Sequence, residues 1–371
     1  MNKKNIIISL LLIYTFLNGF VFFEPALVDY FSIILIFYFI IVSFNSKIIY
    51  LLVYLFLIIA SLFPFSYNFM FNNISNIRFF IIDIFLFSTF FSILSLVHQY
   101  SIDIEELMPA WTSAALINIG SYFIALLLKR NTIFNAEVIQ FGIRLTGFFK
   151  DPNVCGPFIG VPTVYYFYKL MKRITIKNFS LFMVLFVGVI LSFSRAAWLN
   201  LFIGMVIIFM MANVKLTKKF KYSIAIISAF VIFITMFNIE GQNIISFIFQ
   251  RLRLQAYDAE RFESQASFVK MIYINPVFGV GPGNYDSYSG IAAHQTYVRL
   301  IGEKGIFLGL AVSIFLLIPI FLSIKKKDIL LFSIITGLSV NALFVDTLHW
   351  RFLFLIIALI IGGKRRKNVL H

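Results

Sequence analysis

The chain has few charged residues and only one cysteine. Of its 371 residues 13% are charged, whereas 61% are hydrophobic, and the mean hydropathy is +0.94. This composition excludes a soluble domain, because long apolar stretches dominate it, and it is typical of a polytopic membrane protein. The single cysteine, Cys155, excludes an internal disulfide and a Cys-x-x-Cys metal site.

Acidic residues are also scarce, which leaves a large positive charge. The 31 lysines and arginines exceed the 16 acidic residues and give a formal net charge of +15. In a soluble protein this charge would suggest a nucleic-acid ligand, but the sequence contains no soluble basic module, so we predict no nucleic-acid partner. Most basic residues lie in short segments between apolar runs, where membrane topology explains them.

The apolar runs predict the architecture. About 20 apolar residues cross the hydrocarbon core of a bilayer, so we expect an all-α, polytopic bundle of about twelve transmembrane helices, in a single membrane domain over residues 1–371. The first run is expected to be a retained span, because it is too long for a signal peptide and no Ala-x-Ala site follows it. The expected spans are residues 5–23, 28–44, 48–64, 78–98, 110–128, 154–171, 178–194, 197–213, 222–239, 305–324, 329–345 and 347–363.

The positive charge is sorted by residue type across these spans. With the N-terminus inside, 15 of the 19 lysines fall on the cytoplasmic side and 9 of the 12 arginines on the outer side. Lysine on the cytoplasmic face follows the positive-inside rule, so both termini are predicted to be cytoplasmic. Arginine presents a flat, permanently charged fork that suits phosphate, and its outer location predicts an anionic, phosphate-bearing ligand there.

One long segment, residues 240–304, forms an extracytoplasmic loop between the ninth and tenth expected spans. Ile244–Leu254 is expected to be a short amphipathic helix, and Asp258 is the expected N-cap of a second helix that ends before Pro276. The glycine- and proline-rich residues 276–285 must form a loop. The whole segment is large enough to cover a cavity between helices.

Four polar residues at the predicted outer face are candidates for chemistry: Arg144, Arg195, Arg261 and His294. An arginine at a tight turn between spans usually faces a wet cavity or a partner, because pointing into hydrocarbon is costly. Structural readings stay open for each of them. Such arginines also extend to lipid phosphates, a lone loop histidine is often structural, and glycine runs can simply be flexible loops.

Read in order, these residues and their neighbours resemble a known family. The order is Arg-x-Thr-Gly-Phe-Phe-x-Asp-Pro-Asn at 144–153, Ser-Arg-x-Ala at 194–197, Arg261, Pro-x-x-Gly-x-Gly-x-Gly at 276–283 and His-x-Thr-Tyr-x-x-x-x-x-Glu-x-Gly at 294–305. It resembles the O-antigen ligase and O-antigen polymerase superfamily of bacterial surface glycan assembly, over about residues 140–310. Two positions depart from the family pattern: Gln295, where members often have Asn, and Ala196, where they often have Gly.

The resemblance implies a GT-C-like, inverting glycosyltransferase of the bacterial cytoplasmic membrane. Its donor would be an oligosaccharide on undecaprenyl diphosphate, with no metal and no cofactor, and its candidate partners are membrane lipid, a chain-length regulator and a flippase. Arg195 and Arg261 are the candidate diphosphate clamp, and His294 is the candidate general base for the acceptor hydroxyl. Three further residues are candidates for substrate binding: Arg144, Arg299 and Glu303.

Three functions remain open from the sequence. A polymerase transfers the glycan to a lipid-linked repeat unit, whereas a ligase transfers it to lipid A–core; we favour the polymerase. The third is a transporter such as a flippase for lipid-linked sugars. Transporters usually contain internal repeats and broken helices, but the sequence shows no repeat, and only Asp83 is a clear charge in the middle of an expected span. Asp83 is either a buried hydrogen-bonding residue or a functional one.

Overall fold

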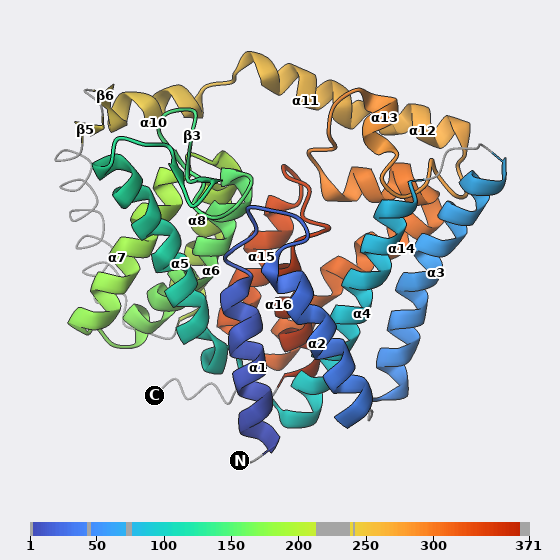
Figure 1. The fold of residues 1–371 in the computed structure, drawn as a ribbon, viewed down its shortest axis with the longest axis horizontal. Coiled ribbons are helices and arrows are strands. Elements are labelled where there is room, and N and C mark those ends of the chain that lie inside the picture. Colours follow the sequence, from blue (N-terminus) through green and yellow to red (C-terminus); the bar gives the residue numbers. More distant parts are fainter. Residues whose placement is uncertain (1–2, 43–45, 72–75, 213–237, 240–241, 364–371) are drawn as a thin grey trace.

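A computed structural model describes residues 3–42, 46–71, 76–212, 238–239 and 242–363. Most of these residues are helical (Figure 1). The helices are α1 (Lys3–Leu17), α2 (Leu27–Val42), α3 (Ile48–Phe71), α4 (Ile77–Tyr100), α5 (Ile104–Leu127), α6 (Pro152–Lys172), α7 (Ile176–Leu191), α8 (Arg195–Met211), α10 (Ile244–Leu252), α11 (Ala256–Ala266), α12 (Phe268–Ile274), α13 (Tyr285–Ser289), α14 (Thr296–Lys326), α15 (Ile329–Asn341) and α16 (Arg351–Gly362).

The helices agree with the expected membrane architecture. Eleven of the twelve expected spans coincide with a helix, and the ninth, 222–239, lies outside the described residues except for its last two. In the described part of the chain, α3, α4, α5 and α14 are long and apolar enough to cross a membrane, and shorter apolar helices accompany them. The protein is therefore a helical, multi-pass membrane protein, and the count of twelve spans stays a prediction.

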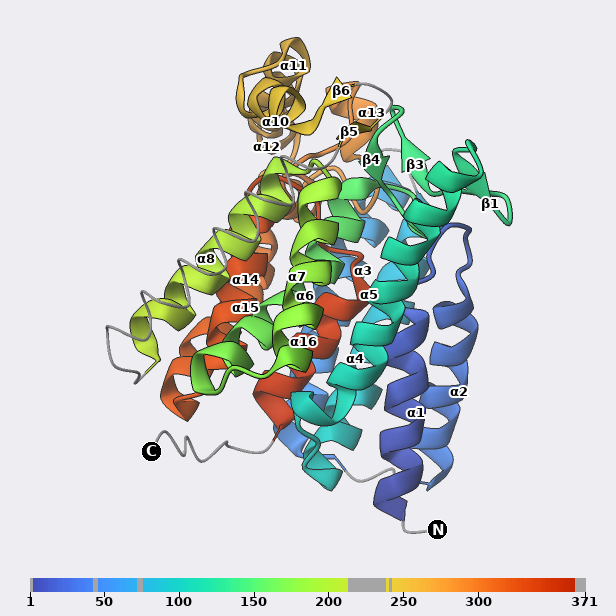
Figure 2. The same cartoon turned by 90° about the vertical axis from the view of Figure 1, so that its left-hand side faces the viewer.

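Short strands are the departure from an all-α fold. Between α5 and α6, the pairs β1 (Thr132–Ile133) with β2 (Ala136–Glu137) and β3 (Ile139–Gln140) with β4 (Arg144–Leu145) are antiparallel, and β5 (Asn238–Ile239) pairs with β6 (Gln242–Asn243). Each strand has two residues, so these pairs act as turns in loops. Figure 2 shows them at the same end of the bundle as α10, α11 and α12.

Local sequence sets where several helices begin. The side chains of five residues directly before a helix accept a hydrogen bond from the helix's first backbone amides, which satisfies donors that the helix itself leaves unpaired. These capping residues are Asp103, Asp151, Thr175, Ser194 and Asp328. Two of them, Asp151 and Ser194, belong to the motifs of the predicted outer face, so part of each motif is a helix cap.

Ionic contacts join distant segments at one end of the bundle. Lys4 of α1 pairs with Glu106 of α5 at 3.4 Å, and Lys169 of α6 pairs with Glu105 at 3.1 Å. Lys326 of α14 donates to carbonyl oxygens at the end of α16. The lysine pattern assigns all of these segments to the cytoplasmic side, and the structure gathers them together. Which side of the membrane this end faces stays a prediction.

The opposite end carries the arginines and the long loop. Glu24, between α1 and α2, pairs with Arg78 at 3.3 Å and with Lys150 at 3.0 Å. Above this end, α10, α11 and α12 follow one another across the bundle (Figure 1). The rings of Phe193 and Phe247 meet at 4.7 Å and attach α10 to the turn between α7 and α8. We call residues 244–274, from α10 to α12, the outer beam.

The outer beam refines two sequence expectations. The amphipathic helix is confirmed as α10, although it ends at Leu252. Asp258 as an N-cap was wrong: α11 begins earlier, after Gln255, and the Asp258 carboxylate accepts a hydrogen bond from the Gln255 amide at 2.8 Å. Asp258 therefore caps the helix from inside its first turn, as an acidic residue at the third helical position does in a capping box.

Helix α14 begins inside the expected loop and is broken. Residues 296–304 were expected in the loop, but they form the first turns of α14. Gly305 has φ +78°, a conformation that favours glycine, and it divides the helix into two parts. The amides of Val280 and Gly281 donate to the carbonyls of Gly302 and Glu303, at 3.0 and 2.9 Å. The glycine-rich loop is therefore bonded to the break, which satisfies backbone groups there.

Candidate functional site

Arg144 is buried and connects three segments of the outer end. It lies on β4, where its Nε donates to the carbonyl of Ser192 at 3.0 Å and its guanidinium donates to Asn153 Oδ1 at 3.2 Å. Asn153 belongs to the Asp-Pro-Asn turn that begins α6, and Ser192 ends α7. The contacts of Arg144 hold the start of α6 beside the turn between α7 and α8. Its expected role in substrate binding stays a prediction.

Arg195 connects the bundle to the outer beam. It is the first residue of α8, directly after the capping residue Ser194, and its guanidinium forms an ion pair with Asp258 of α11. The side chain of Arg195 is 28% exposed, so it reaches the solvent-facing side of this contact. Burial raises the pKa of Asp258, but Arg195 and the Gln255 amide lower it more, and the net pKa lies below its usual value. Asp258 therefore stays ionised and keeps Arg195 in place.

The charge of Arg261 acts on His294, and the catalytic roles predicted for these two residues stay predictions. Burial lowers the pKa of the half-buried His294, and the charge of Arg261 lowers it further, while three carboxylates nearby act in the opposite direction. Those carboxylates are Asp151, Asp286 and Asp346. Among the described residues, no hydrogen-bond partner of the imidazole is found. A neutral imidazole without such a partner is able to accept a proton.

Arg299 and Glu303, the remaining predicted site residues, lie on the first part of α14 and are both buried. Arg299 Nε donates to Glu303 Oε1 at 2.9 Å, one helical turn away, and its other donor reaches Asp346 Oδ2 at 2.5 Å. The guanidinium also stands over the ring of Phe79, 5.5 Å from its centre. Two carboxylates and an aromatic face thus surround the cation. Their expected role in binding substrate stays a prediction.

A second buried ionic group, which includes the next residue of α14, Lys304, surrounds Asp83. Lys304 Nζ lies 2.8 Å from Asp83 Oδ2, and Ser61 Oγ lies 2.6 Å from the same Nζ and 2.7 Å from the same carboxylate oxygen. His349 Nε2 approaches the other oxygen, Asp83 Oδ1, at 3.3 Å. Of the two interpretations left open for Asp83, the structure therefore supports that of a buried hydrogen-bonding residue.

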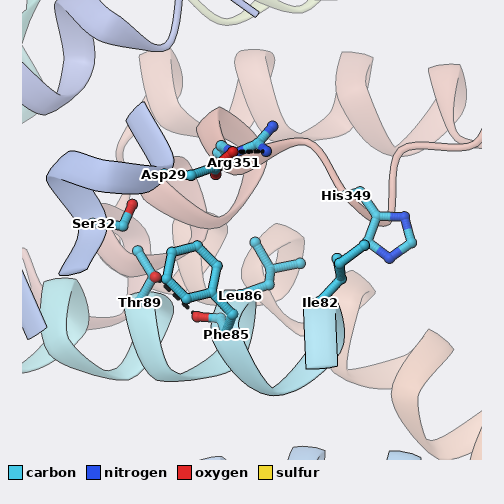
Figure 3. Close-up of a pocket in the computed structure, with 8 residues that line it drawn as sticks. All are labelled: Asp29, Ser32, Ile82, Phe85, Leu86, Thr89, His349 and Arg351. Carbon is cyan, nitrogen blue, oxygen red and sulfur yellow. Dashed lines mark hydrogen bonds and ion pairs between the residues drawn. The ribbon is translucent and has the colours of Figure 1, made fainter. Parts of the chain in front are cut away.

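A small cavity of about 30 Å³ adjoins His349. Figure 3 shows the paired Asp29 and Arg351 on one side of it and His349 on another, with Ser32, Thr89 and Phe85 on the side away from His349. The space suits one or two water molecules rather than a sugar. It separates the Asp29–Arg351 pair, which joins α2 to α16, from the ionic group around Asp83.

Sequence reasoning missed several charged residues of this region. Asp346 lies between the eleventh and twelfth expected spans, and His349 and Arg351 lie at the start of the twelfth. A run of polar residues at a tight turn was the signal that could have found them. Lys304 gave no such signal, because it stood at the margin of an expected loop. Among the described residues, no group of three or more His, Cys, Asp or Glu side chains is placed to hold a metal ion. The metal-independent reaction stays a prediction.

Comparison with known proteins supports the family resemblance. Residues 180–313 match a family model described as O-antigen ligase, and this region contains Arg195, Arg261 and His294. A search of curated proteins finds no match. Members of the matched family are glycosyltransferase-like enzymes. The resemblance read from the motifs is thus confirmed as a similarity: residues 180–313 are similar to the O-antigen ligase family, which supports the O-antigen ligase and O-antigen polymerase superfamily.

Proposed function

We propose that this protein is a polysaccharide polymerase of the bacterial cytoplasmic membrane. It transfers a glycan from an undecaprenyl diphosphate-linked donor to a sugar hydroxyl of a lipid-linked repeat unit, at the outer face. The observation that carries the proposal is that the region matching the family contains both Arg261 and the half-buried His294, whose pKa is lowered by burial and by the charge of Arg261. A proton acceptor and a phosphate-binding cation within electrostatic reach of each other are what transfer from a lipid diphosphate requires.

The leaving group is a lipid diphosphate, and its departure generates negative charge on phosphate oxygens. Arg261 and Arg195 stabilise that charge, since a guanidinium binds phosphate oxygens in pairs. Both are attached to the outer beam, Arg261 as part of α11 and Arg195 through Asp258. Because the outer beam contains Arg261 and binds Arg195, the position of the outer beam over the bundle sets where the diphosphate lies.

The acceptor hydroxyl attacks the anomeric carbon while the bond to the diphosphate oxygen breaks. His294 takes the hydroxyl proton, the new carbon–oxygen bond forms, and the electron pair of the broken bond remains on the diphosphate. A single displacement inverts the configuration at the anomeric carbon. The lowered pKa of His294 keeps its imidazole neutral near pH 7, which is the form that accepts a proton.

The ligase is the second candidate, because the matched family model is described as O-antigen ligase. It shares the donor, the clamp and the base with the polymerase, and differs only in using lipid A–core as the acceptor. A transporter is the less favoured reading. The break in α14 at Gly305 is a transporter-like feature, but the glycine-rich loop is bonded to it, which suits a fixed site better than a moving one.

The surface-glycan ladder on a gel tests this function. A strain that lacks the gene is compared with strains that carry the wild type, His294→Ala or a control variant. The control is His98→Ala, which changes a histidine in the last turn of α4. A ladder that collapses to a single repeat and returns with the wild type and the control, but not with His294→Ala, supports a polymerase. A glycan that polymerises on its carrier but never reaches lipid A–core identifies a ligase. An unchanged ladder in the deletion strain refutes both.

A further inference from the structure

Lys304 is the most deeply buried cation in the described part of the chain, with an exposed fraction of 0%. A charge in the interior of a membrane protein is costly unless it is paired, so such residues are rare and usually have a role. The partners of Lys304 are Asp83 and Ser61, which come from α4 and α3. One charge contact thus joins three helices that are far apart in the sequence.

The location of Lys304 within α14 gives this contact its meaning. The lysine directly precedes Gly305, where the helix breaks, so the ion pair holds the end of the first part of α14. Immediately beside it, the carbonyls of Gly302 and Glu303 accept the amides of the glycine-rich loop. Residues 302–304 are therefore held both by the ion pair of Lys304 with Asp83 and by backbone hydrogen bonds to the glycine-rich loop.

Asp83 also holds a second segment of the site. Its Oδ2 contacts Lys304, whereas its Oδ1 faces His349, three residues beyond Asp346. Asp346 is one of the two carboxylates that bind Arg299, the other being Glu303. A single carboxylate thus relates the first part of α14 to the loop before α16.

The proposed base directly precedes the first part of α14, whereas the proposed clamp belongs to other helices. His294 stands two residues before Thr296, the first residue of α14, whereas Arg195 and Arg261 belong to α8 and α11. A displacement of the first part of α14 would therefore move the base relative to the clamp. Misplacement of a reacting group by about 1 Å can cost on the order of 10²-fold in rate.

We propose that Asp83, Ser61 and Lys304 form a positioning site, which sets the place of residues 294–304 relative to the diphosphate clamp. Its catalytic consequence rests on the proposed function, whereas its structural consequence does not. Lys304 and Asp83 touch no substrate; they act through the segment that carries His294. The ion pair spans α4 and α14, and the hydroxyl of Ser61 completes it from α3.

The test replaces both charges at once, because removing one would leave the other buried and unpaired. The variant is Asp83→Asn with Lys304→Met, purified as the full chain in detergent. The matched control is Asp29→Asn with Arg351→Met, which removes a two-bond ion pair between α2 and α16 that involves no residue of α14. Amide hydrogen exchange is measured over residues 276–283 and 296–305, and kcat and KM are measured for the lipid-linked donor.

We expect amide exchange in these two segments to become at least about tenfold faster in the Asp83/Lys304 variant and to stay unchanged in the control, because the pair holds both segments closed. We expect kcat to fall on the order of 10²-fold while KM for the donor changes by less than about twofold, since the clamp is untouched. Unchanged exchange overturns the proposal, as does faster exchange with wild-type kcat.

Two further results separate the possible failures. If the wild type transfers no sugar, the proposed function fails, and exchange alone decides whether the pair positions the segment. If the double variant does not fold, Ser61→Ala replaces it, because this change keeps both charges and removes only the bridging hydroxyl. Faster exchange over residues 296–305 in Ser61→Ala supports the proposal, and exchange equal to that of the wild type contradicts it.

Discussion

The break in α14 should tolerate no side chain at Gly305, and this prediction can be worked out quantitatively. In Gly305→Ala, the new Cβ would lie 2.1 Å from the carbonyl oxygen of Val277 and 2.8 Å from the amide nitrogen of Phe278. These are backbone atoms, which cannot turn aside as a flexible side chain can. The residue also has φ +78°, where an L-residue with a side chain is strained.

Two free-energy costs therefore add up in Gly305→Ala. The left-handed conformation costs about 1–2 kcal/mol, and forcing extra volume into a packed site typically costs about 1–3 kcal/mol. We expect the free energy of unfolding to fall by roughly 2–5 kcal/mol, the sum of these terms. Because the loop of residues 276–283 is bonded to the break, transferase activity should fall together with stability.

Two other glycines serve as controls for the separate terms. Gly142 has φ +74° but open space around it, so Gly142→Ala should show only the conformational cost of about 1–2 kcal/mol. Gly120 lies within α5 with nothing near its Cβ position, so Gly120→Ala should stabilise the helix by about 0.5–1 kcal/mol. Thermal unfolding of the three purified variants in detergent measures the order. If Gly305→Ala is no less stable than Gly142→Ala, the tight contact between the break and the loop is refuted.

Three shorter predictions follow from the site. His294→Ala should lower kcat about 10²–10⁴-fold while leaving the folded yield intact; turnover equal to that of His98→Ala would remove His294 from the mechanism. Activity should fall as the pH drops through the pKa of His294, which lies below its usual 6.5, and Arg261→Met should move that fall to higher pH, because the lowering charge is gone; a pH–rate profile that keeps its midpoint contradicts this. Lys304→Met alone should destabilise the protein by about 3–5 kcal/mol, and adding Asp83→Asn should recover part of that loss in thermal unfolding.

Local patterns were enough for the helices and for several of their ends. A run of about 20 apolar residues needs no distant partner to be recognised, and α3, α4, α5 and α14 confirm it. The amphipathic pattern of α10 was read in the same way. The expected start of α11 was wrong, because an acidic residue also caps a helix from its third position, where Asp258 accepts a hydrogen bond from the Gln255 amide.

The candidate site, too, was predicted only in part from the sequence. The family match over residues 180–313 agrees with what the motifs predicted, whereas the catalytic roles of His294 and Arg261 stay predictions. The buried surroundings of Arg144 and Arg299 were not predicted, because the same residue types serve as ligands at membrane edges and as structural ties. Their contacts with Ser192 and Asp346 depend on how helices pack, which no local pattern contains.

By itself, the sequence determined the membrane class, the placement of most spans, the distribution of lysine and arginine, and the order of motifs that points to the family. These properties depend on composition and on short-range spacing. Only the tertiary structure decided that Lys304 and Asp83, which are 221 residues apart, share one buried contact, and that the glycine-rich loop is bonded to the break in α14. Burial is the physical reason: a charge or a backbone group removed from water needs a partner, and the packing of the whole chain determines which one it finds.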